Sequence, residues 1–223
     1  WMRQRTPELQ ALFPQARIVE FYGASETSFI AWTESHPDLP DAMVGQPFDT
    51  VDLEVRGATP DSPDGLIFVR SPMLFMDYVG APTDNTAAVR DGDWLSVRDM
   101  GYLDAQGFLC LVGRENRMLV TQGKNLFPEE LEAVLMAQPG VQHASVHGIA
   151  DPIRGQQVVA VVQLNLTEPS PTAQQLSEAC RAQLESYKVP KRFFMCSQWP
   201  LTASGKTDHL AVAKVLACLP PLL

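Results

Sequence analysis

The sequence has little of several features that would place a protein in a narrow class. It carries 17 Lys and Arg against 26 Asp and Glu, and the net charge of −9 disfavours a nucleic-acid-binding protein, which normally presents a basic surface. Its longest apolar runs, such as residues 158–162, are far too short to span a bilayer, so we expect no transmembrane segment. The first residues lead into polar sequence, which is unlike the apolar core of a secretory signal.

Cysteine is also scarce, and the four cysteines are scattered along the chain. They form no CxxC pair and have no histidines at zinc-binding spacing. We therefore expect no structural zinc, and we expect reduced thiols in a cytoplasmic protein. The four are Cys110, Cys180, Cys196 and Cys218.

What is present fits a folded protein of one or two domains, with 223 residues that are 45% hydrophobic and 19% charged. The charge is unevenly distributed. Residues 1–113 carry 7 basic and 17 acidic side chains, whereas residues 114–223 carry 10 and 9. This asymmetry predicts two units, an acidic body and a nearly neutral lysine-bearing portion, with the boundary near residues 114–117.

The local patterns differ between these two portions. Residues 7–13 predict a short helix, and residues 16–21 predict a strand that runs into a polar turn at residues 22–27. Residues 42–113 show short β-like stretches with turn signals about every ten residues, which is typical of a small barrel or sandwich. After residue 113, strands alternate with helices expected to begin at Pro128 and near residue 172. This portion is therefore predicted to be a compact α+β unit.

The first candidate site is the turn after the predicted strand at residues 16–21. The Tyr22 ring could stack on an aromatic ligand, Ser25 could donate to a phosphate, and Glu26 could bind Mg²⁺, which prefers carboxylate and phosphate oxygens. The alternative interpretation is a simple capped turn.

Two further segments carry candidate residues. Asp99 is expected at a strand end, where a carboxylate can bind ribose hydroxyls as it does in dinucleotide sites. Lys206 follows Gly205 in a loop that could deliver an ammonium group to a phosphate or carboxylate. This loop is not a complete P-loop, because Pro200 stands where that motif requires glycine. The alternative for Lys206 is a solvated surface charge.

Taken together and in order, these segments resemble the C-terminal part of the acyl-adenylate-forming enzymes, which include acyl- and aryl-CoA synthetases, luciferases and the adenylation domains of peptide synthetases. The resemblance covers nearly the whole chain. It rests on residues 22–26, 65–78, 94–99, 107–114, 123–132 and 204–206.

The resemblance implies an α+β fold in three parts. Residues 1–113 would be the end of the large domain, with an α/β core edge at 1–35 and a β-barrel-like subdomain at 36–113. Residues 114–117 would be a hinge, and residues 118–223 a small, mobile α+β lid domain.

The resemblance also implies nucleotide-binding roles in the first portion. Tyr22 would stack against adenine, and Gly23 would belong to the same nucleotide-binding motif. Ser25, which replaces the usual threonine, would contact phosphate. Glu26 would hold Mg²⁺ and take part in catalysis, and Asp99 would bind the ribose hydroxyls.

Further roles are implied at and after the hinge. Arg114 would contact ribose or phosphate, and Asn116 would lie at the hinge. Lys206 would be the catalytic lysine that bridges the substrate carboxylate and the α-phosphate. The Gly123 loop would replace it during thioester formation, because pantetheine must pass close to the backbone there. His209 departs from the family pattern, which often has arginine at that position.

The function implied is that of an ATP-dependent acyl-CoA synthetase that uses ATP, Mg²⁺, a carboxylic acid and CoA. Residues 125–130 resemble the CoA-ligase version of their segment, although a carrier-protein pantetheine arm would present the same thiol. Lys188, Lys191 and Arg192 could meet the CoA phosphates or could be solvated surface charges.

The family's phosphate-binding loop and most of its acyl pocket would lie upstream of Tyr22, so we expect this chain alone to catalyse little. The start at Trp1 is interpreted as a cut, with the N-terminal part of the enzyme missing. Two alternatives stay open. The chain could be a non-catalytic module that binds CoA or a carrier protein, or a half-enzyme completed by a separate N-terminal chain. The sequence does not specify which carboxylic acid is used.

Overall fold

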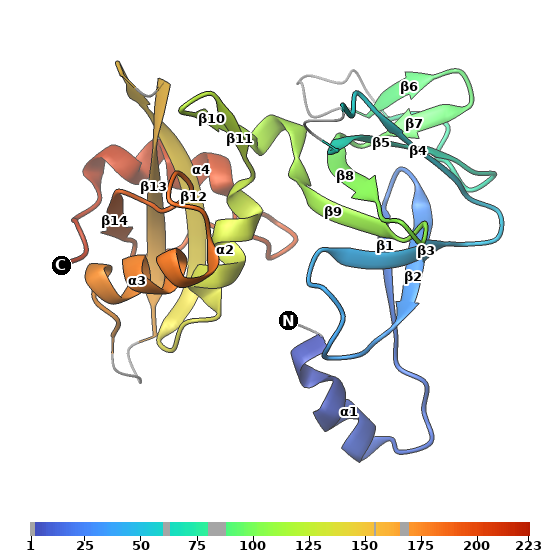
Figure 1. Cartoon of the computed structure of the whole chain (residues 1–223), viewed down its shortest axis with the longest axis horizontal. Helices are drawn as coiled ribbons and strands as arrows, with labels where there is room; N and C mark the ends of the chain where they lie inside the picture. The colour runs from blue at the N-terminus through green and yellow to red at the C-terminus, as the bar shows by residue number, and fades with distance from the viewer. Residues whose placement is uncertain (1–2, 60–62, 80–87, 154, 166–169) are drawn as a thin grey trace. The chain divides into compact units, whose positions relative to one another are not determined.

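The computed structural model describes residues 3–59, 63–79, 88–153, 155–165 and 170–223 (Figure 1). The chain divides into two compact units, Trp1–Asn116 and Arg117–Leu223, and the division falls within the segment 114–117. Trp1, on which the interpretation of the chain start depended, lies outside the described residues. None of the described helices has both the length and the apolar composition needed to cross a membrane.

The first unit is built mainly of short antiparallel strands. Its sheet follows the order β1-β2-β3-β9-β8-β5-β7-β6, with β4 paired to β5. Two 3₁₀ turns, η1 (Arg3–Arg5) and η2 (Glu115–Arg117), lie at its start and at its junction with the second unit. The elements are α1 (Thr6–Leu12), β1 (Val19–Ala24), β2 (Ser28–Glu34), β3 (Met43–Pro47), β4 (Asp52–Arg56), β5 (Gly65–Arg70), β6 (Val89–Asp91), β7 (Trp94–Ser96), β8 (Asp99–Leu103) and β9 (Leu109–Arg114).

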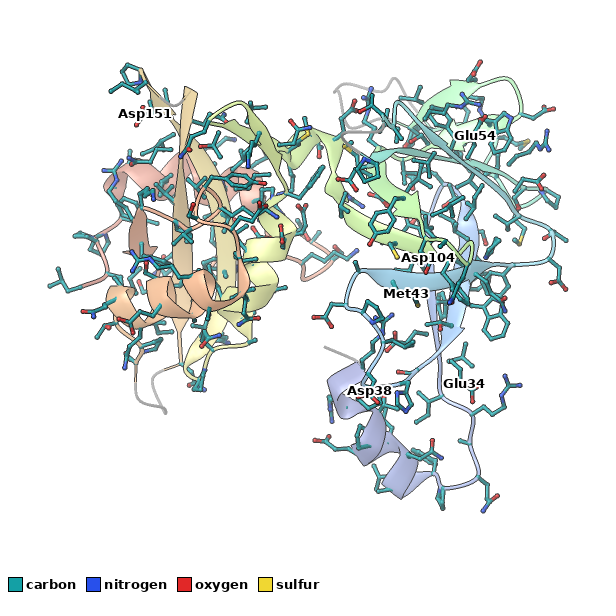
Figure 2. The ribbon with its side chains drawn as sticks, viewed as in Figure 1. Glu34, Asp38, Met43, Glu54, Asp104 and Asp151 are labelled. Atoms are coloured by element: carbon teal, nitrogen blue, oxygen red, sulfur yellow. The ribbon has the colours of Figure 1, made fainter. Side chains whose placement is uncertain are left out.

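The β-barrel-like subdomain expected for this unit is an open sheet in the part of the chain that the structure describes. Among the strands of residues 36–113, β3 and β6 lie at the two ends of the sheet order, and no described pairing joins them. Regularly spaced turn signals predict short antiparallel strands correctly, but they do not determine whether the first and last strands pair. One such turn joins β8 to β9, where Asp104 Oδ1 accepts the backbone N–H groups of Gln106 (2.8 Å) and Phe108 (2.9 Å) (Figure 2).

Strand β1 extends further than the sequence pattern predicted. Tyr22 and Gly23 were expected in a turn, but they belong to the strand, and the turn is confined to residues 25–27. A bulge between Tyr22 and Gly23 lets β1 continue beside β2. Gly23 is required at this bulge, because a Cβ there would lie 2.0 Å from the carbonyl oxygen of Ser28.

The second unit is a three-stranded sheet with helices on both faces. The long hairpin β12–β13 is antiparallel, and β14 pairs in parallel with β13. A separate two-stranded hairpin, β10–β11, precedes it. The elements are β10 (Leu119–Thr121), β11 (Lys124–Leu126), α2 (Pro128–Met136), β12 (Val141–Asp151), β13 (Gly155–Leu164), α3 (Ala173–Gln183), β14 (Arg192–Met195), α4 (His209–Val215) and the 3₁₀ turn η3 (Leu216–Cys218).

Both long helices of this unit begin where the sequence indicates. Helix α2 starts at Pro128, whose fixed φ suits the first turn, and Glu129 and Glu130 complement the helix dipole. Helix α3 is preceded by a capping box, in which Thr172 Oγ1 accepts the N–H of Gln175 and the Gln175 side chain accepts the N–H of Thr172. These signals fix both helix starts from the sequence.

The apolar run at residues 158–162 is buried on both faces of β13. Val158, Ala160 and Val162 pack in one cluster with residues of α2 and α3. Val161 points to the other face, where it packs with Val212 of α4. Side chains of a strand alternate between its two faces, so a continuous apolar run is expected where helices cover both (Figure 1).

We expect Leu131→Ala to destabilise the second unit by about 2–5 kcal/mol, because Leu131 of α2 is fully buried and its truncation leaves a cavity. Met136→Ala on the same helix is the matched control, since Met136 is 49% exposed and its truncation should cost less than about 1 kcal/mol. Urea unfolding of the chain measures both. Equal costs for the two variants would contradict this packing.

Candidate functional site

Three of the predicted site residues meet in the first unit. Asp99 at the start of β8 and Arg114 at the end of β9 are directly opposite each other across the two strands. The Nε–H of Arg114 donates to Asp99 Oδ1 at 2.9 Å, and the hydroxyl of Tyr22 donates to Asp99 Oδ2. Tyr22 and Arg114, which lie 77 and 15 positions from Asp99 in the sequence, therefore both bind its carboxylate.

Burial and a neighbouring charge fix the protonation of Tyr22 in this cluster. Burial raises the pKa of Tyr22 above its usual range, and the negative charge of Asp99 raises it further. The Tyr22 hydroxyl therefore stays protonated and acts as a donor. The Asp99 side chain is only 9% exposed, whereas that of Arg114 is 58% exposed. A carboxylate has about four lone-pair sites, and Tyr22 and Arg114 each use one of them, so two remain on Asp99.

The turn after β1 presents Ser25 and Glu26. Ser25 is exposed, and Glu26 is half-buried. The hydroxyl of Tyr78 donates to Glu26 Oε1 at 2.8 Å, and the N–H of Phe75 donates to the Glu26 carbonyl at 2.8 Å. Segment 75–78 therefore holds this turn. Thr27, which sequence reasoning missed, is fully buried, and its Oγ1 accepts the N–H of Ala24 at 3.2 Å.

Gly123 lies at the tip of the β10–β11 hairpin in the second unit. Gln122 and Gly123 have φ values of 54° and 76°, which is the geometry of a two-residue type I′ turn. The space around Gly123 is open, because a Cβ there would meet no atom within 4 Å among the described residues. The hairpin therefore presents bare backbone at its tip.

Lys206 is exposed at the end of a compact loop in the second unit. Leu201 and Thr207 form an isolated β-bridge that closes this loop. Inside it, the Thr202 N–H donates to the Lys206 carbonyl at 2.8 Å, and the Lys206 N–H donates to Thr202 Oγ1 at 3.2 Å. Gly205 has a φ of 79°, which glycine adopts without strain. The loop is thus ordered by its own hydrogen bonds.

The other cations singled out in the sequence are placed differently from Lys206. The Lys188 Nζ lies 2.8 Å from Glu130 Oε2, and its side chain is only 16% exposed. Lys191 and Arg192 are both exposed. Lys188 therefore pairs within the second unit, and Lys191 and Arg192 are the accessible members of the trio.

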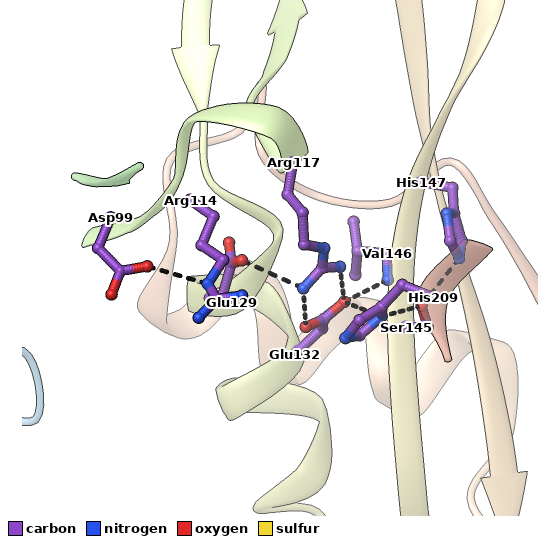
Figure 3. Close-up of polar contacts among 9 residues, drawn as sticks. All are labelled: Asp99, Arg114, Arg117, Glu129, Glu132, Ser145, Val146, His147 and His209. Atoms are coloured by element: carbon purple, nitrogen blue, oxygen red, sulfur yellow. Dashed lines mark hydrogen bonds and ion pairs between the residues drawn. The ribbon is translucent and has the colours of Figure 1, made fainter. Parts of the chain in front are cut away.

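A buried polar network in the second unit was missed by sequence reasoning (Figure 3). Glu132 of α2 is 5% exposed and accepts two hydrogen bonds from Arg117, at 2.5 and 2.9 Å. Its Oε1 also accepts the N–H of Val146 at 2.7 Å. Arg117 additionally pairs with Glu129 at 3.2 Å. The first residue of the second unit is thereby bound to a helix of that unit, and through Glu132 to its sheet.

The network continues across the sheet to helix α4. Ser145 is fully buried, and its Oγ lies 2.8 Å from His147 Nε2 and 2.7 Å from His209 Nδ1. His209 Nδ1 lies 3.7 Å from Glu132 Oε1, which favours a proton on that nitrogen. Ser145 then accepts from His209 and donates to His147. Ser145 and His147 carried no sequence signal, and His209, noted only as a departure from the family pattern, meets Ser145 across 64 positions of the chain.

The described residues contain no group of three or more His, Cys, Asp or Glu side chains that could hold a metal ion. Glu26 therefore belongs to no preformed cage of three or more such side chains in the described part of the chain. This donor set suits Mg²⁺, which commonly binds through one or two carboxylates together with substrate phosphates.

Residues 130–206 match the family model of the AMP-binding enzyme C-terminal domain. Over 97% of its length, the chain is 39% identical to an uncharacterized acyl-CoA ligase, YhfT, of Bacillus subtilis, and it covers 44% of that protein. It is 34% identical to the 2-succinylbenzoate-CoA ligase of Enterococcus faecalis, with 85% of this chain and 39% of the relative covered. The chain thus spans about two fifths of the length of these relatives.

Solved structures give the same relationship. The O-succinylbenzoate coenzyme A synthetase of Bacillus subtilis, in complex with AMP, superposes with a TM-score of 0.76 at 27% identity, over 92% of this chain and 42% of that one. The amide bond synthetase McbA of Marinactinospora thermotolerans gives 0.74 at 30% identity, over 88% and 41%. The resemblance to adenylate-forming enzymes and the mixed α+β fold are confirmed.

We expect the stability of the chain to fall as the pH is lowered from about 6.5 to about 4, with His147 as one cause. Burial lowers the pKa of His147 to about 4, and the positive charge of Arg117 contributes to the lowering. Between these pH values the unfolded chain binds more protons than the folded chain. The free energy of unfolding therefore falls, by roughly 2 kcal/mol between pH 7 and pH 5 for this group.

His147→Gln should remove this contribution, and urea unfolding at several pH values measures it. His36→Gln is the control, because it makes the same substitution at an exposed histidine. A pH dependence that His147→Gln leaves unchanged would contradict the assignment.

Proposed function

We propose that this chain, whose residues 130–206 belong to the AMP-binding enzyme C-terminal domain family, is the C-terminal portion of an ATP-dependent acyl-CoA ligase. The observation that carries the proposal is the relationship to acyl-CoA ligases over nearly the whole chain, at 39% identity to YhfT. In the proposed reaction, a carboxylate oxygen attacks the α-phosphorus of ATP and pyrophosphate leaves. The CoA thiolate then attacks the acyl carbonyl, AMP leaves and the thioester forms.

In the first unit, Tyr22, Gly23, Asp99 and Arg114 are proposed to bind the nucleotide. The hydrogen bond from Tyr22 to Asp99 would hold the tyrosine ring in place for stacking on adenine. Asp99 would accept the ribose hydroxyls, and the exposed Arg114 would turn away from it to contact ribose or phosphate. The remaining lone pairs of Asp99 and the exposure of Arg114 support this assignment.

Ser25 and Glu26 are proposed to face the phosphates. Ser25 is exposed at the turn and offers a hydroxyl donor. Glu26 is proposed to hold Mg²⁺, which would supply positive charge to the phosphate oxygens. The hydrogen bond from Tyr78 fixes Glu26 Oε1 and so orients the carboxylate.

In the second unit, Lys206 and Gly123 are proposed to serve the two half-reactions. The exposed Lys206 ammonium would stabilise negative charge between the substrate carboxylate and the α-phosphate during adenylation. The open backbone at Gly123 would let the pantetheine arm pass during thioester formation. A change in the relative orientation of the two units about Asn116 is proposed to replace Lys206 by the Gly123 turn at the reacting groups.

A further part of the same enzyme is proposed to cover one face of the first unit. Strand β1 ends the described sheet, and Phe21 and Phe29 on the β1–β2 hairpin are 63% and 45% exposed, with their rings 5.0 Å apart. Val19 is also 44% exposed. Apolar side chains grouped on a sheet edge favour burial against more polypeptide.

A carrier-protein pantetheine arm is an alternative thiol acceptor, because it presents the same chemistry as CoA. The relatives named as CoA ligases favour CoA. A non-catalytic module that binds one of these partners is the alternative to an enzyme.

Carboxylate-dependent ATP–pyrophosphate exchange tests the function. We expect exchange with the longest product of the gene that encodes this sequence, tested with fatty, aryl and small organic acids. We expect none above background with the 223-residue chain alone. Exchange by this chain alone would show that it is a complete catalyst. A longer product that is inactive with every acid would favour the non-catalytic module.

Lys206→Ala in the active protein should lower the rate of adenylation by about 10²–10³-fold, because it removes the cation proposed to stabilise the developing charge. Thioester formation from a supplied acyl-adenylate should stay within about twofold of wild type. Lys214→Ala is the matched control, since Lys214 is another exposed lysine of the same unit. Equal loss of both half-reactions in Lys206→Ala would refute the role.

A further inference from the structure

We propose that the Lys206 loop (residues 201–207) and the Gly123 turn (Gln122 and Gly123) are held by two independent sets of contacts on the β12–β13 hairpin. Thr207 is then a positioning residue for adenylation, and Thr121 is one for thioester formation. The inference rests on the proposed function, since that function assigns Lys206 to adenylation and Gly123 to thioester formation. Neither threonine is proposed to touch a substrate. Each would act through the loop that it holds.

The Lys206 loop is fixed at its closing end by Trp199. The indole Nε1–H donates to Thr207 Oγ1 at 3.1 Å, immediately after Lys206. The Trp199 ring stacks on His143 of β12, with ring centroids 5.4 Å apart and an angle of 14° between the planes. Thr207 thus connects the lysine to a side chain that rests on the sheet.

A second contact supports the same end of the loop. His209, three residues after Lys206, begins helix α4, and its Nδ1 meets the buried Ser145 Oγ of β12 at 2.7 Å (Figure 3). Asp208 caps this helix by accepting the N–H of Ala211 at 2.9 Å. The chain that leaves the loop is therefore anchored to the middle of β12.

The Gly123 turn is held at a different place. Thr121, at the end of β10, is 2% exposed, and its Oγ1 donates to the Gln156 carbonyl at 2.8 Å. The N–H of Val120 donates to Gln156 Oε1 at 3.0 Å. Gln156 lies near the start of β13, where it pairs with Ala150 of β12. Both of these hydrogen bonds end on Gln156 of β13, and Leu126 of β11 anchors the same hairpin in the core of the unit.

The two anchors are far enough apart to act separately. Ser145 pairs with Val161 across the hairpin, and Gln156 is five residues before Val161 on the same strand. At about 3.4 Å per residue, the anchors are roughly 17 Å apart along the sheet. Substitutions more than about 7–10 Å apart with no shared partner usually have additive effects. Loss of one anchor should therefore leave the other loop in place.

Two matched substitutions test this in the active protein. Thr207→Val and Thr121→Val replace a hydroxyl by a methyl group of similar size and remove one hydrogen bond each. We expect Thr207→Val to lower the kcat of adenylation by about three- to ten-fold and to leave thioester formation from a supplied acyl-adenylate within about twofold of wild type. Thr121→Val should show the opposite pattern.

The serine variants provide the rescue. Thr207→Ser and Thr121→Ser keep the hydroxyl and should restore most of the affected rate. If the threonines acted only through general stability, each valine variant would lower the rates of both half-reactions together, in proportion to the fall in its urea unfolding midpoint. The split between half-reactions distinguishes positioning from stability.

Amide hydrogen exchange on the 223-residue chain gives a readout that does not depend on activity. Thr207→Val should speed exchange at Gly205 and Lys206, whose N–H groups are bonded within the loop. Thr207→Val should leave the exchange rates of the β10–β11 amides unchanged. Thr121→Val should speed exchange at the β10–β11 amides and leave the rates at Gly205 and Lys206 unchanged.

The outcomes separate the two proposals. Independent positioning is supported if each variant speeds amide hydrogen exchange only in its own loop and lowers the rate of only its own half-reaction. Exchange that rises in both loops with either variant, or in neither, overturns it. The amide hydrogen exchange could be specific to each loop while the wild-type protein shows no ATP–pyrophosphate exchange. That result would retain the two anchors but overturn the proposed function, and with it the assignment of each anchor to a half-reaction.

Discussion

A buried carboxylate stabilises a fold only when a cation and hydrogen-bond donors surround it, and Glu132 imposes this requirement on the second unit. At 5% exposure it accepts two hydrogen bonds from Arg117 and one from Val146. Arg117 is the first residue of the unit, Glu132 belongs to α2 and Val146 belongs to β12. The same requirement therefore fixes the start of the unit to its helix and to its sheet. Removing Arg117 alone would leave an uncompensated buried charge, which is far more costly than loss of a surface ion pair.

Asp99 in the first unit is a buried carboxylate of a different kind. Its cation, Arg114, is 58% exposed, so the guanidinium can leave the carboxylate without crossing a packed layer. Its other partner, Tyr22, is a neutral donor that remains when Arg114 moves. The guanidinium bound to Glu132 is buried instead, since the Arg117 side chain is only 16% exposed. The exposure of the bound guanidinium thus distinguishes Asp99, which we propose binds the ribose, from Glu132, which pairs within its own unit.

The sequence predicts the local structure of this chain better than its long-range contacts. The start of α2 at Pro128 and the short antiparallel strands with regularly spaced turns, such as the turn after Asp104, follow from rules that act within a few residues. The extension of β1 through Gly23 does not, because the bulge depends on Ser28 of the neighbouring strand. The Tyr22, Asp99 and Arg114 cluster could be expected only through the family resemblance. Neither the residues nor the resemblance indicated the network from Arg117 to His209, whose members come from four separate elements.

The β12–β13 hairpin gives these contacts a common frame. Ser145 and Gln156 lie on its two strands, and the contacts of the Lys206 loop and the Gly123 turn both end on it. Glu132 binds the same hairpin at Val146 and ties it to Arg117, where the unit begins. Any rotation of the unit about Asn116 would therefore carry both loops together, with the spacing between them set by the strands. An exchange of one loop for the other at a fixed site then requires no rearrangement inside the unit. The buried network ties this frame to helices α2 and α4, because Glu132 and His209 each bind a residue of β12.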